Sequence, residues 1–152
     1  MIKSFIAFLL TGLVMACASS DRDDAVIPAK PIDYTVGLVG KYPVTFLRDA
    51  GRSMDLPQGE TTGEFEVSKV DSVTIFIRTT VEFKASHYSY RLSGKYGLKP
   101  SPADPKQFTL LVITSSLSSP SQATGTISPT EIEQQFVGSY EGDITQFKGK
   151  RG

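Results

Sequence analysis

The sequence predicts an all-β domain, a small antiparallel barrel or sandwich of about seven or eight strands. Apolar and polar residues alternate with a period of two through most of the chain after residue 35. Gly, Pro and Ser separate the alternating segments, and the nine Phe and six Tyr add to the strand-forming residues. The one helix signal is a Ser-Pro-Thr-Glu stretch near the C-terminus, and it predicts only one or two turns.

The N-terminal residues form a segment of a different kind. After Lys3, residues 5–16 (FIAFLLTGLVMA) are apolar apart from Thr11 and Gly12. Such a run is short for a membrane span and typical of the hydrophobic part of a secretory signal peptide, whereas the alternative is a buried core helix. Residues 1–16 are therefore predicted to be a signal peptide.

The end of that run, Val14-Met15-Ala16-Cys17, resembles the lipobox of bacterial lipoproteins. The resemblance implies cleavage before Cys17, a diacylglyceryl group on its thiol and acylation of the new amino terminus. Ala18, where Asp would imply retention at the inner membrane, implies the outer membrane. The run DRDD at residues 21–24 loosely resembles a signal for export to the cell surface. The periplasmic face and the surface thus both stay open, and a solvated tether is the alternative for these charges.

Residues 17–35 are predicted to be the lipidated N-terminus and a flexible linker, and residues 36–152 the β-barrel domain. Small, charged and Pro residues without a sustained apolar period fill the linker. A flexible coil of this length spans about 20–25 Å r.m.s., which would hold the domain clear of the lipid headgroups. Lipidation would also remove Cys17, the one cysteine of the chain, from any catalytic or metal site.

The first two alternating segments predict half-buried strands. In residues 36–46 the even positions are apolar or Gly and should face inward, and Pro43 on the opposite face predicts an edge strand or a bulge. Phe65 and Val67 share a face in the second segment. Asp71-Ser72 then predicts a hairpin turn.

Residues 72–83 and 87–98 predict two longer strands. Their outward-facing residues are expected to include Thr74, Arg78, Thr80 and Glu82. The side chains expected to face inward are Val73, Ile75, Ile77, Val81, Phe83, Tyr88, Tyr90, Leu92, Gly94, Tyr96 and Leu98.

The C-terminal third mixes strand and helix signals. Residues 108–115 (FTLLVITS) are continuously apolar and predict a central strand. Ser128 to Glu131 matches a capping box with Pro at the first helical position, which predicts a short helix near residues 129–135. Residues 136–147 alternate again on even positions and predict one strand, and the polar residues 148–152 predict a frayed tail.

The triplet Gly-x-Tyr occurs at residues 40–42, 94–96 and 138–140. Residues two apart share a strand face, so Gly leaves room for the Tyr ring and lets the strand bend in a barrel. A Tyr-lined ligand site is the alternative reading.

The stretches VGKYPVTF, GEFEVSKVDSVTI and FVGSYEGDITQFKGKR resemble the opening strand, second hairpin and closing strand of lipocalin-like and calycin-like barrels. The resemblance implies a small closed or nearly closed barrel, with Tyr42 where lipocalins usually carry Trp.

Few residues point to chemistry. His87 is the one histidine and is expected to face outward, so it is the best but weak candidate for a hydrolase. Glu131, Glu133, Glu141 and Asp143 are expected on solvated faces rather than as a catalytic pair. No metal-ligand spacing or phosphate-binding loop occurs, so no enzyme activity, metal or cofactor is predicted. A formal net charge of zero gives no indication of nucleic acid as a partner.

Two functions stay open beside the membrane contact through Cys17. The first is a non-enzymatic binding module with a small apolar ligand inside the barrel. The second is an envelope structural or protein-interaction lipoprotein, such as an inhibitor or complex subunit, that uses an outer face or strand edge. A filled interior would count against the first. The residues predicted to line the ligand site are Tyr42, Phe46, Ile75, Ile77, Tyr90 and Tyr96.

Overall fold

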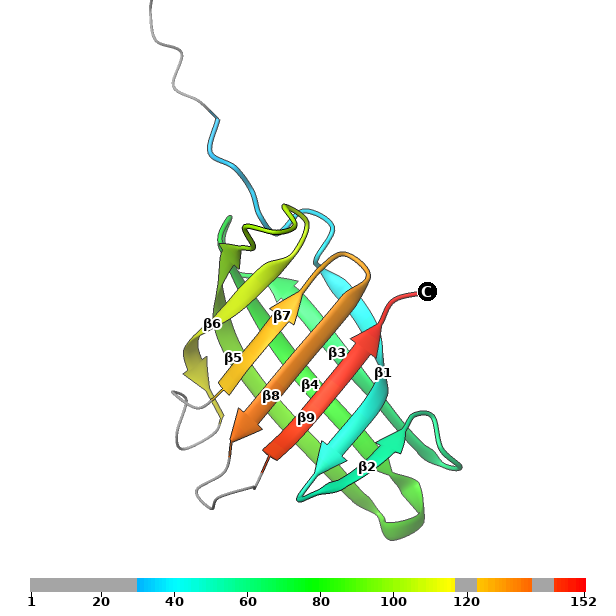
Figure 1. The fold of residues 1–152 in the computed structure, drawn as a ribbon. Coiled ribbons are helices and arrows are strands. Elements are labelled where there is room, and N and C mark those ends of the chain that lie inside the picture. The colour runs from blue at the N-terminus through cyan, green and yellow to red at the C-terminus, as the bar shows by residue number, and fades with distance from the viewer. Residues whose placement is uncertain (1–29, 117–122, 138–143) are drawn as a thin grey trace, which may run out of the picture. The chain divides into compact units, whose positions relative to one another are not determined.

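The computed structural model describes residues 30–116, 123–137 and 144–152, and residues Pro31–Gly152 form one structural unit (Figure 1). Antiparallel strands of one sheet build this unit. Within the described residues they are β1 (Gly40–Asp49), β2 (Arg52–Asp55), β3 (Thr61–Lys69), β4 (Thr74–Phe83), β5 (Tyr88–Pro100), β6 (Phe108–Ser115), β7 (Ala123–Ile127), β8 (Glu131–Val137) and β9 (Ile144–Lys150). A single 3₁₀ turn, η1 (Lys84–Ser86), connects β4 to β5.

The sheet closes on itself, which confirms the predicted small antiparallel barrel. Each strand from β3 to β9 pairs with the next, and β1 pairs with both β3 and β9. Strand β2 is additional, because it pairs with the second half of β1 beside the barrel. Closure leaves the polar groups of both β1 and β9 paired, so the sheet does not end in a free edge at that seam.

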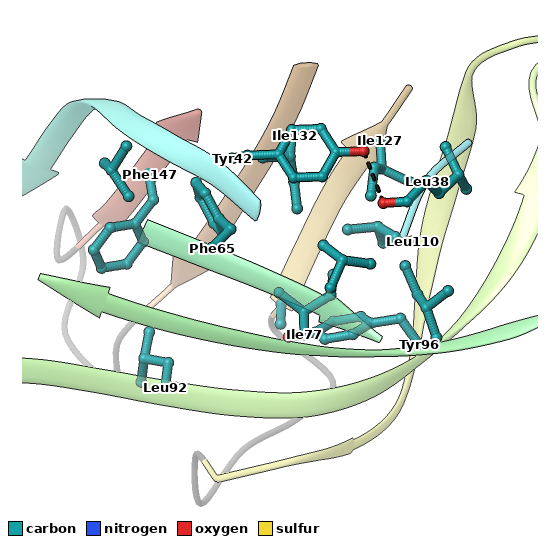
Figure 2. Close-up of a cluster of buried hydrophobic side chains, with 14 of the residues drawn as sticks. Leu38, Tyr42, Phe65, Ile77, Leu92, Tyr96, Leu110, Ile127, Ile132 and Phe147 are labelled. Carbon is teal, nitrogen blue, oxygen red and sulfur yellow. Dashed lines mark hydrogen bonds between the residues drawn. The ribbon is translucent and has the colours of Figure 1, made fainter. Parts of the chain in front are cut away.

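The core lies inside the barrel, where the inward positions of the strands meet. Figure 2 shows the side chains of Tyr42, Phe65, Ile77 and Phe147 among this cluster. The alternation predicted for β3, β4 and β5 is confirmed over most of their length. It fails at the strand ends, where Val73 and Tyr88 are exposed and Thr74 is buried. The Asp71-Ser72 turn is confirmed by the amide of Val70, which donates to the carbonyl of Thr74.

A bulge divides β1, as Pro43 on the outer face suggested. The register of β1 against β9 shifts between Val44 and Phe46. One extra residue at a bulge reverses which of the following side chains point into the barrel and which point outward. Leu47 is therefore buried, while Phe46 is only half-buried. The prediction that residues 36–46 keep one inward parity is wrong at Phe46 for this reason.

The predicted helix at residues 129–135 is wrong, because these residues form a hairpin turn and strand β8. Ser128 Oγ does accept the Glu131 amide at 3.0 Å, as in a capping box. The Ser128 amide, however, donates to the Glu131 carbonyl at 2.8 Å and closes a β-turn. The same local bond thus begins a strand, which pairs with β7 and β9 along its whole length.

Two further strand predictions need correction. Strand β6 lies between β5 and β7, but its outer face is not covered, since Leu111 and Ile113 are exposed. Residues 136–147 are not one strand: they span the end of β8 and the start of β9, which pair with each other. On β9 the odd positions face inward, so Phe147 is buried and Ile144 is only half-buried.

The Gly-x-Tyr triplet of β5 has the predicted packing. A Cβ on Gly94 would lie 3.0 Å from the Tyr96 ring and 2.6 Å from the carbonyl oxygen of Thr114. Only Gly lets the ring and the neighbouring strand approach this closely. The third triplet, residues 138–140, lies outside the described residues, as do the predicted signal peptide, the stretch that resembles a lipobox and the DRDD run.

Candidate functional site

Most of the residues predicted to line a ligand site lie inside the barrel, where they are packed side chains of the core. Tyr42 and Ile75 are 0% exposed, Ile77 is 1% and Tyr96 is 3%. Tyr90 is partly buried, with its ring 5.5 Å from the Phe147 ring centroid. The barrel interior thus brings five of the six predicted residues into one cluster.

Phe46 is the sixth, and it lies outside the cluster. The bulge in β1 places it beside Lys148 of β9, whose Nζ is 5.8 Å from the centroid of the Phe46 ring. Phe46 also lines a surface hollow of about 490 Å³ together with Ser53 and Asp55 of β2. Phe46 therefore lies on the outer surface of the barrel, with the Lys148 side chain over its ring.

The interior holds a polar group of residues that the sequence analysis missed. Thr79 Oγ1 donates to Gln134 Oε1 at 2.7 Å, and both side chains are buried. Gln134 also hydrogen-bonds the Tyr96 hydroxyl. Burial raises the pKa of Tyr96 to about 12, and the Gln134 bond offsets part of that rise. The three groups satisfy one another, which limits the cost of burying them in an apolar barrel.

Their positions could have been partly read from the sequence. Thr79 lies between the inward Ile77 and Val81, so strict alternation places it inside. Gln134 alternates with Ile132 and Phe136 on β8, but the helix prediction hid that pattern.

Arg151 seals one end of the barrel beside Tyr42. Its guanidinium carbon lies 4.1 Å from the centroid of the Tyr42 ring, and its nitrogens donate to the carbonyls of Gly37 at 3.0 Å and Val39 at 3.1 Å. The Tyr42 hydroxyl lies 2.9 Å from the Leu38 carbonyl oxygen (Figure 2). Burial raises the pKa of Tyr42, and the Arg151 charge offsets part of the rise. The predicted frayed tail, residues 148–152, is therefore wrong at Arg151, and it is also wrong at residues 148–150, which continue β9 and pair with β8.

The outer wall of β3, β4 and β5 carries an open, polar groove of about 840 Å³. Charged side chains line it, including an ion pair in which Arg78 Nη1 lies 3.0 Å from Glu66 Oε2. Glu82 and Arg91 line the same groove. This mixture of charges suits a polar contact surface better than an apolar ligand.

His87 is exposed, as predicted, in the turn between β4 and β5. It takes a left-handed conformation with φ of 53° and lines a hollow of about 520 Å³ with Glu60, Glu82 and Tyr88. The carboxylates of Glu131 and Glu133 are ion-paired on the outer wall with Lys150 and Lys148, both at 3.5 Å. Glu141 and Asp143 lie outside the described residues.

Within the described ranges, no three His, Cys, Asp or Glu side chains gather as metal ligands would. In the same ranges, no helix combines the length and hydropathy that a membrane crossing requires.

Comparison with known proteins supports the fold. No protein-family model matches the chain, and no curated protein matches it in sequence. Among solved structures, a redesigned β-barrel is 14% identical, with a TM-score of 0.51, covering 82% of this chain and 99% of its own. A chain solved bound to DFHBI is 16% identical, with a TM-score of 0.47 and coverages of 79% and 98%. A de novo designed fluorescence-activating β-barrel is 18% identical, with a TM-score of 0.42 and coverages of 80% and 100%. At these identities the likeness concerns the fold alone.

Proposed function

We propose that this protein is a lipoprotein of the bacterial outer membrane whose barrel is a non-enzymatic binding module for envelope proteins. The lipid on Cys17 would hold the module at the membrane, on the periplasmic face or at the surface. The observation that carries the proposal is the packing of the barrel interior. The outer surface of the barrel would then bind the envelope protein, as in an inhibitor or a subunit of a complex.

A ligand could enter the packed interior only by displacing side chains that their neighbours hold in place. Tyr42 is fixed by its hydroxyl bond and by Arg151, and Tyr96 is fixed by Gln134 and by its contact with Gly94. A ligand would have to move side chains that are 0–3% exposed, and each of them gains about 1.5–3 kcal/mol from its burial.

A small apolar ligand inside the barrel remains the second candidate. The observation that favours it is the polar group formed by Thr79, Gln134 and Tyr96. A few convergent polar groups in an apolar chamber are what ligand sites use to fix orientation. This function requires a second packing of the same core, in which the Gln134 amide turns to the ligand.

A fluorescent apolar probe distinguishes the two candidates. N-phenylnaphthylamine is titrated into the lipid-free unit Pro31–Gly152, which closes its own sheet and buries its own core. We expect no saturable one-to-one binding. Saturable binding that is lost in Gln134→Leu and kept in the outer-wall variant Ile113→Ser would establish the interior ligand site and contradict binding by the outer surface alone.

The anchor has its own test. In a bacterium that processes lipoproteins, the full chain should incorporate labelled palmitate and sediment with membranes, and Ser20→Ala should behave alike. Cys17→Ser should remain an uncleaved, unlabelled precursor. A Cys17→Ser chain that is processed normally would refute the lipid anchor.

A further inference from the structure

One end of the barrel, here called the tether end, is covered by residues 31–39. The amide of Tyr34 donates to the carbonyl of Ser72 in the β3–β4 turn at 2.8 Å, and the Tyr34 ring lies 5.4 Å from the Phe108 ring of β6. Lys69 forms an ion pair with Asp33, and this bond lowers the pKa of the Asp33 carboxyl to about 2. The β7–β8 connection lies at the same end, and the β4–β5 connection at the opposite end (Figure 1). The covering segment is thus fixed to the barrel.

The tether end exposes aliphatic side chains although the segment that carries them is fixed. Between them, Thr35 and Leu38 are buried at 2% and 0%, which orients the other side chains of the segment outward. The exposed set comes from the covering segment and from the β3–β4 turn: Ile32 at 68%, Val36 at 75%, Val39 at 46%, Val70 at 46% and Val73 at 44%. Exposed apolar side chains that gather in this way indicate a surface that binds another protein or a membrane.

We propose that the tether end docks on the lipid bilayer, with these five side chains entering the interface between headgroups and acyl chains. The inference rests on the lipid anchor proposed above. The described unit begins at Pro31, next to Ile32, and the predicted linker between Cys17 and Pro31 would span only about 20 Å r.m.s. as a flexible coil. The anchor would therefore hold this end within reach of the headgroups, where weak contacts act at high effective concentration.

The chemistry of the tether end suits lipid better than protein. Protein interfaces concentrate their affinity in Trp, Tyr and Arg, whereas Leu and Val are under-represented there. The exposed set contains only Ile and Val. Lys99 at the end of β5 and Lys106 in the β5–β6 connection are exposed at this end (Figure 1), and neither forms an ion pair with another described residue. Basic side chains beside an apolar patch favour a surface that contains anionic lipid.

The first test measures binding to vesicles. The lipid-free unit Pro31–Gly152 is mixed with vesicles of phosphatidylethanolamine and phosphatidylglycerol, or of phosphatidylcholine, and bound protein is measured by flotation. We expect binding to the first, weaker binding to the second, and a loss of about tenfold or more in Ile32→Ser/Val36→Ser. The matched control is Leu111→Ser/Ile113→Ser, which removes aliphatic side chains of similar exposure (50% and 55%) from the barrel wall and should bind like the unchanged unit.

The second test measures orientation. The unit lacks cysteine, because Cys17 is the only one in the chain, so one cysteine can carry an environment-sensitive fluorophore. A label on Val70→Cys should shift to the blue and gain intensity with vesicles. A label on Ser86→Cys in η1, at the opposite end, should not.

The outcomes separate docking from anchoring. Because the unit lacks Cys17, vesicle binding does not depend on lipidation, and palmitate labelling of the full chain does not depend on docking. Absence of vesicle binding, equal losses in both double variants, or a shift at Ser86 as large as at Val70 would each overturn the docking of this end. If palmitate labelling succeeds while vesicle binding fails, the anchor stands, and the aliphatic patch is covered by a partner protein instead.

Discussion

At the scale of single residues, the contact between Arg151 and Tyr42 joins the residue that follows β9 to strand β1. Tyr42 is in the first strand, and Arg151 follows the last one. The guanidinium lies on the Tyr42 ring and donates to carbonyls of the segment that precedes β1. Hydrogen bonds from a charged donor contribute more than bonds between neutral groups.

Replacing Arg151 should therefore destabilise the barrel. We expect Arg151→Ala to lower the free energy of unfolding by about 2 kcal/mol, with Arg151→Lys in between, because Lys keeps the charge but loses the planar fork. Urea unfolding followed by Tyr fluorescence measures the loss. Arg91→Ala on the outer wall is the control and should change stability by less than about 0.5 kcal/mol. Equal effects at both positions would contradict the role of Arg151.

Tyr96 should make the stability of the protein dependent on alkaline pH. Its folded pKa of about 12 exceeds the usual value of 10.0, so the folded state holds a proton that the unfolded state has already released. The contribution is complete below pH 10 and is lost as the pH rises from 10 to 12, with a slope of at most about 1.4 kcal/mol per pH unit. Denaturant unfolding at several pH values should show this loss, and Tyr96→Phe should flatten it. A Tyr96→Phe chain with an unchanged slope would assign the effect to other groups.

At the scale of elements, close approach of strands at glycine shapes the barrel. Strand β5 allows a direct test, because Gly94 and Gly97 lie on the same strand. A Cβ on Gly94 would meet backbone at 2.6 Å, whereas a Cβ on Gly97 would meet its nearest neighbours at 3.8 Å. We expect Gly94→Ala to lose about 2–3 kcal/mol and Gly97→Ala to be neutral or slightly stabilising. Thermal unfolding measures the stability of both variants. Equal losses of stability would contradict the role of the close approach at Gly94.

The sequence predicted well the strands in which the alternation of apolar and polar residues is the only signal. Strands β3 and β4 follow from alternation, because each has one face in the core and one in water. Strand β8 was missed because Ser128 and Glu131 make the same local bond in a capping box and in this turn. Pairing of β8 with its two neighbours in the sheet, β7 and β9, decides between the two structures.

The candidate site could be predicted only in part. Tyr42, Ile75, Ile77 and Tyr96 are interior residues, as alternation indicated. Phe46 was misplaced because Pro43 indicated an edge strand or a bulge without fixing the bulge's position, and the bulge exchanges the faces of the residues that follow it. Whether an interior is hollow or filled depends on how side chains from strands distant in sequence meet, as Tyr96 of β5 meets Gln134 of β8.

At the scale of the whole molecule, the two ends of the barrel differ in chemistry. The tether end exposes Ile and Val beside Pro31, where the described unit begins, while the opposite end carries His87 and the half-exposed Tyr88. Under the proposed anchoring, the first end meets lipid, and the polar groove on β3–β5 and the opposite end face outward. A partner protein is then expected to contact the groove or the His87 end.

Native mass spectrometry of the mature protein, purified from membranes in mild detergent, tests lipid anchoring and outer-surface binding together. We expect the mass of residues 17–152 plus the lipid groups on Cys17, without a further small molecule bound. A chain that keeps residues 1–16 without lipid would contradict the anchor. A stoichiometric small molecule retained by the barrel would contradict binding by the outer surface alone.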